Sequence, residues 1–503
     1  MFKTAELGQK IPKDEYHELL PELRARLVQT QYHMRAADFS AIIIIAGTDS
    51  VGRHDIVTTL FEWMDPRYLE TRSFGDPTDE ERDRPLFWRY WRVLPAHGRT
   101  AVFYGSWVRR PLMDRLDDLI DDDQLDAAIR RINIFERLLA HDRTILLKFW
   151  LHLPARQLRK RLKSLDKDPD AASKISDHDR TIVDDYSRAQ QIFTRFVRKT
   201  SIPEAPWIIV ESADHRYRNL AIGRTILDAC TKGLEAAEAR ARRKREEGDK
   251  PPTVTPQPAN SNGEVRSVLD TLDLTKTIER EAYSEQLEKH QNKLFALQTR
   301  AFHEGQTSVL VFEGWDAAGK GGVIRRMIRG MDPRDYRIVP VSKPTEEEFA
   351  HHYLWRFWRE LPRKGHVRIF DRSWYGRVLV ERIEGLATEE QWRRAYSEIN
   401  DFEEELVEHG ILLLKFWMHI DKDEQLRRFK AREAIPFKKH KIGEEDYRNR
   451  EKWDAYEAAV NEMVQRTSTE YAPWYLIEGN DKRYARVKVI KTFVERLEQR
   501  LSK

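Results

Sequence analysis

The sequence of 503 residues has one cysteine, Cys230, and no long apolar segment. A single cysteine excludes an internal disulfide bond and a cysteine-rich metal site. The longest apolar runs, 42–45 and 411–414, are far shorter than the roughly 20 residues that a helix needs to cross a bilayer. Residues 1–7 lack the apolar core of a secretory signal peptide. We therefore expect a cytoplasmic protein that has no membrane partner.

A large excess of charge of one sign is also missing. The 88 Lys and Arg residues nearly balance the 84 Asp and Glu residues, which leaves a formal net charge of +4. So small an excess does not indicate a nucleic-acid partner, and a site for a polyanion would have to arise from local clustering of basic side chains. The chain is long enough for roughly two to four ordinary domains.

The chain repeats itself at one fixed offset. Gly47 corresponds to Gly314, 267 residues later, and the same offset relates many Trp and Pro residues of the two halves. The matching segments are 64–66 with 331–333, 88–91 with 355–358, 106–107 with 373–374, 146–150 with 413–417, and 205–207 with 472–474. Because chance does not hold one offset over so many rare residues, we predict a tandem duplication of one domain. The copies are expected at 1–234 and 265–503, joined over 235–264 by a charged helix tail and a flexible linker rich in Pro and Asn.

Each copy alternates apolar, strand-like segments with helical ones. In the second copy, strands are predicted at 309–312, 336–341, 367–370, 411–417 and 474–477. Its helices are predicted at 283–302, 323–329, 346–359, 389–409, 424–430, 445–467 and 483–501. This alternation indicates an α/β fold in which a parallel sheet lies between two layers of helices. In such a sheet the ligand binds at the carboxyl ends of the strands.

The strand 309–312 runs into Gly314-Trp-Asp-Ala-Ala-Gly-Lys-Gly321 and then into a helical segment. A strand, a glycine-rich loop with a lysine and a helix N-terminus together form a phosphate-binding loop (P-loop), in which backbone N–H groups and the lysine contact the anion. The predicted phosphate-binding residues are Gly314, Ala317, Ala318, Gly319, Lys320, Gly321 and Gly322. The competing interpretation is a glycine-rich turn whose lysine is solvated. Gly321 stands where the usual P-loop has a Ser or Thr that holds Mg²⁺, so Asp316 is the candidate metal ligand.

A second acidic candidate follows the strand 367–370. Asp371 ends this apolar segment, which is where P-loop enzymes place a carboxylate beside the phosphate loop to hold Mg²⁺. Arg372 follows directly, and its planar guanidinium can bridge phosphate oxygens. The alternative is that Asp371 and Arg372 cap the next helix.

A basic segment lies late in the second copy. Residues 426–441 contain seven Lys or Arg residues against one Glu, and Pro436 interrupts them. At this place in a P-loop kinase-like chain, such a segment is typical of a lid that closes over charged phosphates and expels water. Its candidate phosphate ligands are Arg432, Lys438, Lys439 and Lys441. The competing interpretation is a solvated basic turn.

The first copy lacks most of these groups. At the offset of 267 residues, Arg53 replaces Lys320, His54 replaces Gly321, Tyr104 replaces Asp371, Gly105 replaces Arg372 and Leu165 replaces Arg432. Asp49, in the place of Asp316, is kept. Such a copy should neither neutralise a transferring phosphoryl group nor hold a metal well. Because its apolar segments are intact, we expect a catalytically degenerate copy that folds and serves as a structural, dimer-like partner.

Three motifs follow one another in the second copy: Gly-x-Asp-Ala-Ala-Gly-Lys-Gly-Gly at 314–322, Asp-Arg-Ser-Trp-Tyr at 371–375, and the basic lid with its proline. Together they resemble the polyphosphate kinase 2 family, over nearly the whole second copy and, in degraded form, over the first. The resemblance implies a thymidylate-kinase-like, three-layer fold with a helical lid. It also implies Mg²⁺-dependent phosphoryl transfer from inorganic polyphosphate to AMP, which gives ADP. The fused two-domain layout is similar to that of family members in which one half is active.

The resemblance implies roles for individual residues. Lys320 and the loop amides would hold a phosphate, while Asp316 and Asp371 would hold Mg²⁺ and orient the nucleotide phosphate. The residues that would neutralise the end of the polyphosphate are Arg372, Arg432 and Lys441, with Lys438 and Lys439 as further candidates. Ile435 stands where the family often has Asp before the lid proline.

Another acceptor and two other classes of function stay open. A polyphosphate-dependent ADP kinase would share every motif named above. An ATP-dependent kinase of a nucleotide or a metabolite would use the same P-loop without polyphosphate. A non-catalytic polyanion-binding module would not need Asp316 or Asp371, and no aromatic and basic nucleic-acid-binding module stands out in the sequence. The expected partners are therefore inorganic polyphosphate and AMP, without nucleic acid, and a homo-oligomer stays open.

Overall fold

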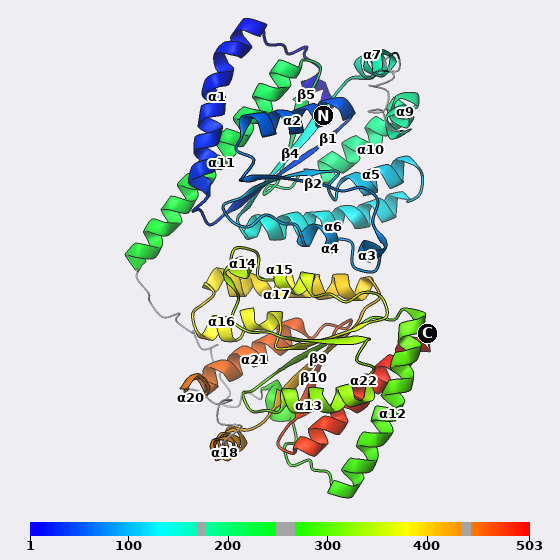
Figure 1. The fold of residues 1–503 in the computed structure, drawn as a ribbon, viewed down its shortest axis with the longest axis vertical. Coiled ribbons are helices and arrows are strands. Elements are labelled where there is room, and N and C mark those ends of the chain that lie inside the picture. Colours follow the sequence, from blue (N-terminus) through cyan, green and yellow to red (C-terminus); the bar gives the residue numbers. More distant parts are fainter. Residues whose placement is uncertain (166, 168–176, 248–266, 435–443, 503) are drawn as a thin grey trace, which may run out of the picture. The chain divides into compact units, whose positions relative to one another are not determined.

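The computed structural model describes residues 1–165, 167, 177–247, 267–434 and 444–502 (Figure 1). The chain folds into two compact units. The first is formed by Met1–Pro77, Arg89–Asp249 and Thr345–His352, and the second by Thr78–Trp88, Lys250–Pro344 and Tyr353–Lys503. The domain boundaries that the repeat predicts, 1–234 and 265–503, stay a prediction. Among the described residues, none of the helices is both long and apolar enough to span a membrane.

The second unit is built around a parallel five-stranded sheet. Its strands are β6 (Ser308–Gly314), β7 (Tyr336–Pro340), β8 (Val367–Asp371), β9 (Leu412–His419) and β10 (Trp474–Glu478), in the spatial order β10-β9-β6-β8-β7. The register pairs Phe312 with Asp371, so the loop after β6 and the end of β8 lie at the same edge. Val309 to Phe312, in the central strand, are all 0% exposed because helices cover both faces of the sheet.

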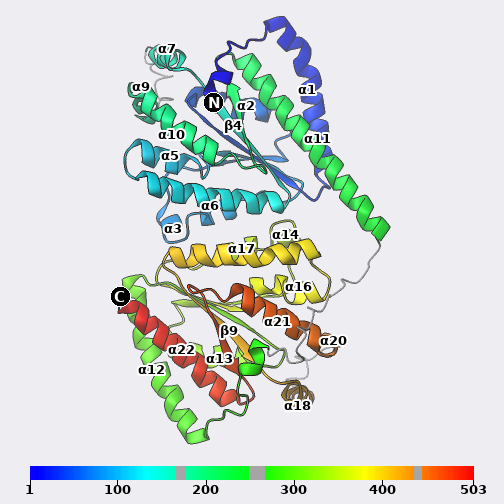
Figure 2. The same ribbon diagram turned by 180° about the vertical axis from the view of Figure 1, so that it is seen from behind.

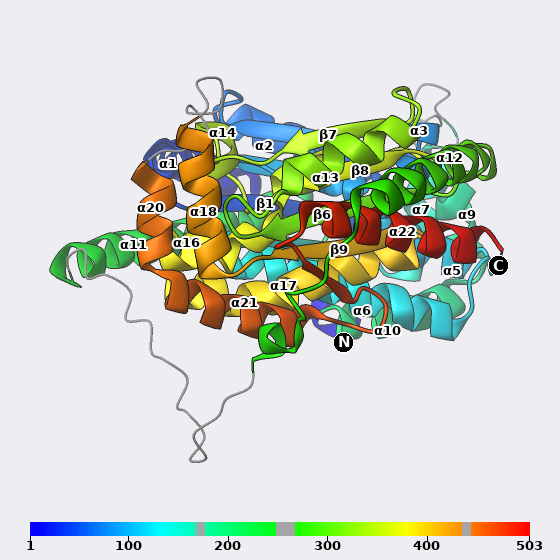
Figure 3. The ribbon, with the colours of Figure 1, turned by 90° about the horizontal axis from the view of Figure 1, so that it is seen from below.

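Helices form a layer on each face of this sheet (Figures 1 and 3). One face carries α12 (Arg280–Glu304), α13 (Lys320–Met327) and α22 (Lys482–Leu501). The other carries α15 (Trp355–Arg359), α16 (Val380–Ile383), α17 (Glu389–Glu408) and α21 (Trp453–Thr467). The remaining helices of the second copy are α14 (Glu346–Phe349), α18 (Lys422–Glu433) and α20 (Glu444–Glu451), with short 3-10 turns η2 (Val268–Thr271), η3 (Ile328–Gly330) and η4 (Trp374–Arg377).

The prediction of a single helix at 346–359 is wrong. The structure has two short helices there, α14 and α15, with residues 350–354 between them. A capping box of Thr345 and Glu348 starts α14, which is mostly acidic and has no buried residue. α15 instead buries three aromatic residues, Trp355, Phe357 and Trp358. The chain bends between the helices because no single apolar stripe runs through both of them.

The helix predicted at 445–467 is also divided into two, α20 and α21, which meet at Lys452. The sequence of α20, Glu-Glu-Asp-Tyr-Arg-Asn-Arg-Glu, has no apolar stripe. α21 starts with the buried Trp453 and continues with a buried face. The two segments therefore require different packing, although their residues have similar helix propensities.

The first unit repeats the architecture of the second (Figure 2). Its parallel sheet contains β1 (Ser40–Gly47), β2 (Leu69–Ser73), β3 (Thr100–Tyr104), β4 (Thr144–His152) and β5 (Trp207–Glu211), in the order β2-β3-β1-β4-β5. One face carries α1 (Lys13–Met34), α2 (Ser50–Trp63) and α11 (His215–Glu247), and the other carries α5 (Arg109–Leu116), α6 (Asp122–His141) and α10 (Tyr186–Lys199). The first copy also forms η1 (Phe2–Ala5), α3 (Asp79–Arg82), α4 (Trp88–Trp91), α7 (Ala155–Leu165) and α9 (Asp177–Asp184). The predicted duplication of an α/β domain with a parallel sheet is thus confirmed.

Both units bury the same ion pair at equivalent positions. Lys415 Nζ lies 2.6 Å from Glu403 Oε2, and Lys148 Nζ lies 2.5 Å from Glu136 Oε2, with all four side chains 0% exposed. Burial lowers the pKa of Lys415 and raises the pKa of Glu403, while the attraction between the two charges opposes both shifts. The first copy has therefore kept its core even though it has lost most of the predicted catalytic residues.

Candidate active site

The P-loop connects β6 to α13, and its backbone is shaped to receive an anion. Gly314 has a φ of 147°, and a Cβ there would lie 2.4 Å from Met418 O, so only glycine fits. A Cβ at Gly319, Gly321 or Gly322 would come no closer than 3.7 Å to the nearest heavy atom of the described residues. Space is therefore left in front of the loop, at the N-terminus of α13, where backbone N–H groups and the helix dipole favour an anion.

Lys320 is the first residue of α13 and lies half-buried against the loop. Its Nζ donates to Gly314 O at 2.6 Å and to Trp315 O at 3.3 Å. Burial lowers the pKa of Lys320, and the carboxylate of Asp316 opposes that shift. The ammonium group is thus held inside the curve of the loop, where it can exchange a backbone carbonyl for a phosphate oxygen.

The predicted catalytic residues lie together in the second unit. A cavity of about 440 Å³ at the carboxyl ends of β6 and β8 is lined by Asp316, Lys320, Asp371, Arg372 and Arg432. The loop residues Ala317, Ala318, Gly319, Gly321 and Gly322 line it as well. Gly314 is not among the described residues that line this cavity; it forms the turn between β6 and the loop. The remaining predicted phosphate ligands, Lys438, Lys439 and Lys441, lie outside the described residues.

Asp316 and Asp371 are both half-buried at this cavity. Asp316 Oδ1 accepts a hydrogen bond from Arg372 Nη2 at 3.2 Å, and its Oδ2 accepts one from Asn449 Nδ2 at 3.1 Å. Among the described residues, no three His, Cys, Asp or Glu side chains are grouped so that they could hold a metal. Mg²⁺ usually binds one or two carboxylates together with waters and substrate phosphates. Two carboxylates beside a P-loop fit a Mg²⁺ ion that binds together with a phosphate.

Arg372 has a left-handed backbone conformation, with a φ of 68°. The equivalent residue of the first unit is Gly105, with a φ of 71°. A non-glycine residue in such a conformation costs on the order of 1–3 kcal/mol and occurs most often at functional sites. The conformation places the guanidinium beside Asp316, which is the geometry that a shared phosphate or metal site needs.

Two neighbouring residues were not predicted from the sequence. Glu313 is buried behind the P-loop, where its Oε1 accepts a hydrogen bond from Ser373 Oγ at 2.7 Å. Burial raises the pKa of Glu313, while the nearby charge of Lys320 opposes that shift. The pair ties the P-loop to the turn that carries Arg372, although sixty positions separate the two residues in the sequence. The sequence contains one indication of this role: the second copy has Glu313 where the first copy has Ala46.

Arg428, on α18, was predicted only as one of several basic residues of the lid. The structure buries it to 2% exposure and uses it to hold the P-loop. Its Nη1 donates to Ala317 O at 3.0 Å and Ala318 O at 2.9 Å, and its Nη2 donates to Gly479 O at 2.6 Å and Asn480 O at 3.0 Å. Arg428 therefore positions the loop from outside, through its carbonyl groups, while the amides stay available to an anion.

A second cavity, also of about 440 Å³, lies beside the first. Its basic lining residues, here called the basic groove, are Arg325, Arg326, Arg427, Arg428, Arg432, Lys482 and Arg486. They come from α13, α18 and α22, and Arg432 lines both cavities. Burial, followed by repulsion from Arg428, lowers the pKa of Lys482 to about 8. Arg432 was predicted from the sequence as a phosphate ligand, whereas the basic residues of α13 and α22 were not.

The P-loop of the first unit is partly occupied by the protein's own side chains. Asp49 is 0% exposed, and its Oδ2 lies 2.5 Å from Arg161 Nη1 and 3.8 Å from Arg218 Nη1. A Cβ at Gly52 would lie 2.5 Å from Arg218 Nη1, so a guanidinium group occupies the inside of this loop. At the equivalent place the second unit has Ala485. The carboxylate that the two copies share is thus engaged in internal ion pairs in the first.

Known proteins match the chain over its whole length. A family model described as polyphosphate kinase 2 matches residues 10–238 and 277–503. A protein of Pseudomonas aeruginosa named polyphosphate:AMP phosphotransferase is 48% identical over 499 residues, with 99% of each chain covered. A protein of the same name from Acinetobacter johnsonii is 36% identical over 488 residues, which cover 95% of this chain and 96% of its own. A crystal structure from Pseudomonas aeruginosa, described as a polyphosphate kinase 2, is 45% identical, covers 100% of both chains and has a TM-score of 0.87. With both of its repeats matched, the chain belongs to the polyphosphate kinase 2 family.

Proposed function

We propose that the second unit transfers a phosphoryl group from inorganic polyphosphate to AMP, with Mg²⁺, and releases ADP. The observation that carries this proposal is the cavity that brings the P-loop, two carboxylates and three arginines together. The full-length relatives named polyphosphate:AMP phosphotransferase support AMP as the acceptor.

In this reaction Lys320 and the loop amides bind the phosphoryl group that is transferred. Arg372, from the end of β8, and Arg432, from α18, neutralise the charge on its outer oxygens. Phosphoryl transfer needs little covalent help from a protein, so positioning and charge neutralisation account for most of the catalysis.

Asp316 and Asp371 are the residues that would hold Mg²⁺. When bound, the metal neutralises charge on the phosphate oxygens of donor and acceptor. Arg372 donates to Asp316 and so fixes the orientation of that carboxylate. Asn449 donates to the other oxygen of the same group, which restrains it from a second direction.

The basic groove explains why the donor is a phosphate chain. Because Arg432 lines both cavities, the groove continues directly into the P-loop cavity. A chain with one negative charge per phosphate would lie along α13, α18 and α22 with its end at Lys320. None of the described residues that line the groove is aromatic, so it has no ring on which the adenine of ATP would stack. This composition favours polyphosphate over ATP as donor.

The groove is tested by Arg486→Ala, with Arg496→Ala as a matched control. Both residues are on α22, but only Arg486 lines the groove. Losing one charge-assisted contact should raise the KM for polyphosphate about tenfold and leave the KM for AMP unchanged. The control should change neither. An unchanged KM for polyphosphate in Arg486→Ala would contradict the proposed path.

The first unit, on this proposal, contributes no catalytic residue. Its Asp49 is engaged by Arg161 and Arg218, and Tyr104 stands in place of the second carboxylate. Its intact buried ion pair between Lys148 and Glu136 supports a structural role.

A further inference from the structure

The first unit contains a cavity of about 390 Å³ beside its P-loop, at the carboxyl ends of β1, β2 and β3. Sites for small molecules usually have roughly 300–1,000 Å³, so this volume suits a ligand of nucleotide size. Helices α2, α5, α9 and α10 supply the rest of the wall. Residues with different chemistry line it, including Arg53, His54, Phe74, Tyr104, Ser106 and Trp150.

This cavity has lost the acidic character of the active site. Ala46 and Tyr104 line it at the places that Glu313 and Asp371 hold in the second unit. The carboxylate of Asp49 is buried with Arg161. Among the described residues, the charged side chains that line the cavity are Arg53, Arg109 and Asp179, together with the imidazoles of His54 and His178. In the second unit a metal ion would be needed to offset the repulsion between an anion and two carboxylates. The first unit lacks that pair, so an anion can bind here without a metal.

The exchange of glutamate for alanine also leaves a buried hydroxyl group without a partner. In the second unit Ser373 Oγ donates to Glu313 Oε1. The equivalent Ser106 is 2% exposed, and its Oγ has no hydrogen-bond partner within the described part of the chain. The Nε of Arg53 is likewise buried and unpaired there, while its Nη1 donates to Gly47 O at 3.1 Å. Both Ser106 and Arg53 line the cavity, so each of these donors is available to a ligand oxygen there.

A phosphate chain does not suit the first unit, because four of the seven basic residues of the basic groove are replaced there by uncharged ones. Thr58, Thr59, Leu165 and Asn219 replace four of the groove arginines, Arg325, Arg326, Arg432 and Arg486. The inside of the loop is also occupied by Arg218. A ligand of this cavity therefore carries its phosphate as a single group.

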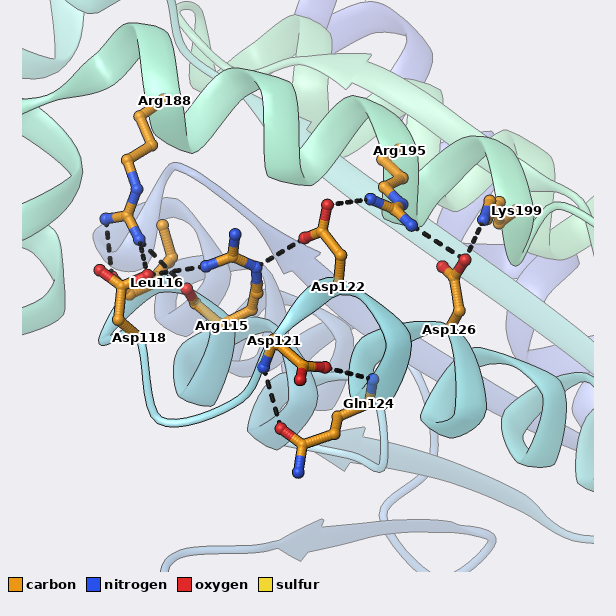
Figure 4. Close-up of polar contacts among 10 residues, drawn as sticks. All are labelled: Arg115, Leu116, Asp118, Asp121, Asp122, Gln124, Asp126, Arg188, Arg195 and Lys199. Atoms are coloured by element: carbon orange, nitrogen blue, oxygen red, sulfur yellow. Dashed lines mark hydrogen bonds and ion pairs between the residues drawn. The ribbon is translucent and has the colours of Figure 1, made fainter.

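Aromatic rings supply the apolar part of the wall. Phe74 and Tyr104, which are half-buried, line the cavity together with the buried rings of Trp150 and Phe193. Aromatic rings that face a cavity can stack on a nucleobase. The helices that carry part of the wall are braced by ion pairs across α5, α6 and α10 (Figure 4). These pairs join Arg188 to Asp118, Arg195 to Asp122 and Asp126, Lys199 to Asp126, and Arg115 to Asp118 and Asp122. These pairs connect α10 to α6 and to the turn after α5.

We propose that this cavity of the first unit binds a nucleoside monophosphate without a metal ion. The phosphate group lies at the first turn of α2, next to Arg53 and Ser106, and the base lies against the aromatic rings. Binding at this place is separate from phosphoryl transfer in the second unit and does not depend on the proposed reaction.

The test is a calorimetric titration of AMP into the full-length protein in EDTA, which removes Mg²⁺. One AMP per chain should bind. Tyr104→Asp, which restores the carboxylate found at Asp371, should weaken this binding by about tenfold or more through repulsion of the phosphate. Tyr104→Phe keeps the ring and should retain the affinity. Lys320→Gln, in the second unit, is the matched control and should leave the affinity in EDTA unchanged.

Melting curves of each variant show whether the first unit is still folded. Inorganic phosphate should bind at least about tenfold more weakly than AMP, because it cannot contact the aromatic rings. The proposal is overturned if AMP does not bind in EDTA, or if folded Tyr104→Asp binds AMP as tightly as the parent protein. It is also overturned if Lys320→Gln abolishes the binding, or if phosphate and AMP bind equally well.

Discussion

The same substitution at equivalent positions should have opposite consequences in the two units. We expect Asp316→Asn to lose activity and keep stability, and Asp49→Asn to keep activity and lose stability. Asp316 is half-buried at the P-loop cavity, where its second oxygen contacts Asn449 and its charge would be used for Mg²⁺. Asp49 is fully buried and its charge is used by Arg161 and Arg218.

The two magnitudes follow from these environments. Removing one partner of a buried ion pair costs about 3–5 kcal/mol. The lower end applies to Asp49, because the Arg161 side chain is 28% exposed and Asn can still accept from Gly52 N. About 3 kcal/mol corresponds to a fall in melting temperature of roughly 6–12 °C for a unit of this size. Losing an electrostatic group that acts in the transition state costs about 10²–10³-fold in kcat, which is the expectation for Asp316→Asn.

Chromatographic measurement of ADP gives kcat, and thermal unfolding of the same samples gives stability. Asp49→Asn should retain kcat within about twofold at a temperature below its lowered transition. The reasoning is refuted if Asp49→Asn loses as much activity as Asp316→Asn while the protein is still folded, because the first unit would then take part in catalysis.

Further predictions follow from single environments. Arg372→Gly should relieve the left-handed backbone, keep or raise the melting temperature, and lower kcat about 10²-fold through the lost charge; a fall in stability would contradict it. The charge of Lys482, whose pKa is lowered to about 8, is present below that pH and lost above it. The KM for polyphosphate should therefore rise from about pH 7 to about pH 9, and rise less in Lys482→Arg; equal pH profiles would speak against this role. Lys415→Met removes the cation beside Glu403, which is 0% exposed, and should cost about 3–5 kcal/mol in urea unfolding. EDTA should stop turnover and excess Mg²⁺ restore it; full activity in EDTA would remove the assigned role of Asp371.

Much of the fold was predictable because its signals are local or repeated. The duplication was indicated by one offset held over many Trp and Pro residues. The P-loop was indicated by its glycines and its lysine between a strand and a helix, and at Gly314 the structure leaves no room for a side chain. The break at 350–354 was not predictable from helix propensity, because it reflects which residues the tertiary structure buries. Propensity is a weak prior that packing overrides.

At the candidate site, most of the charged groups that face the P-loop cavity were predicted from the sequence, but Arg325 and the residues that hold these groups in place were not. The hydrogen bond between Ser373 and Glu313 joins the turn after β8 to β6, and Arg428 donates to backbone carbonyl groups. No spacing rule reveals either contact. Both copies have an aspartate in the P-loop, which on its own suggests that the first copy keeps a metal ligand. In the structure, however, Asp49 is paired with Arg218, which lies on α11, far along the chain. A position-by-position comparison of the two copies shows this difference, because Arg218 of the first copy corresponds to Ala485 of the second.

The most direct test of the central claim is a nucleotide assay by chromatography. Purified protein is mixed with Mg²⁺ and long-chain polyphosphate, with AMP and ADP in separate samples and no ATP. The proposed function predicts ADP formed from AMP. ATP formed from ADP, with AMP unchanged, would keep polyphosphate as donor and overturn the acceptor. No product in either sample, with activity only after ATP is added, would contradict the account and indicate an ATP-dependent kinase.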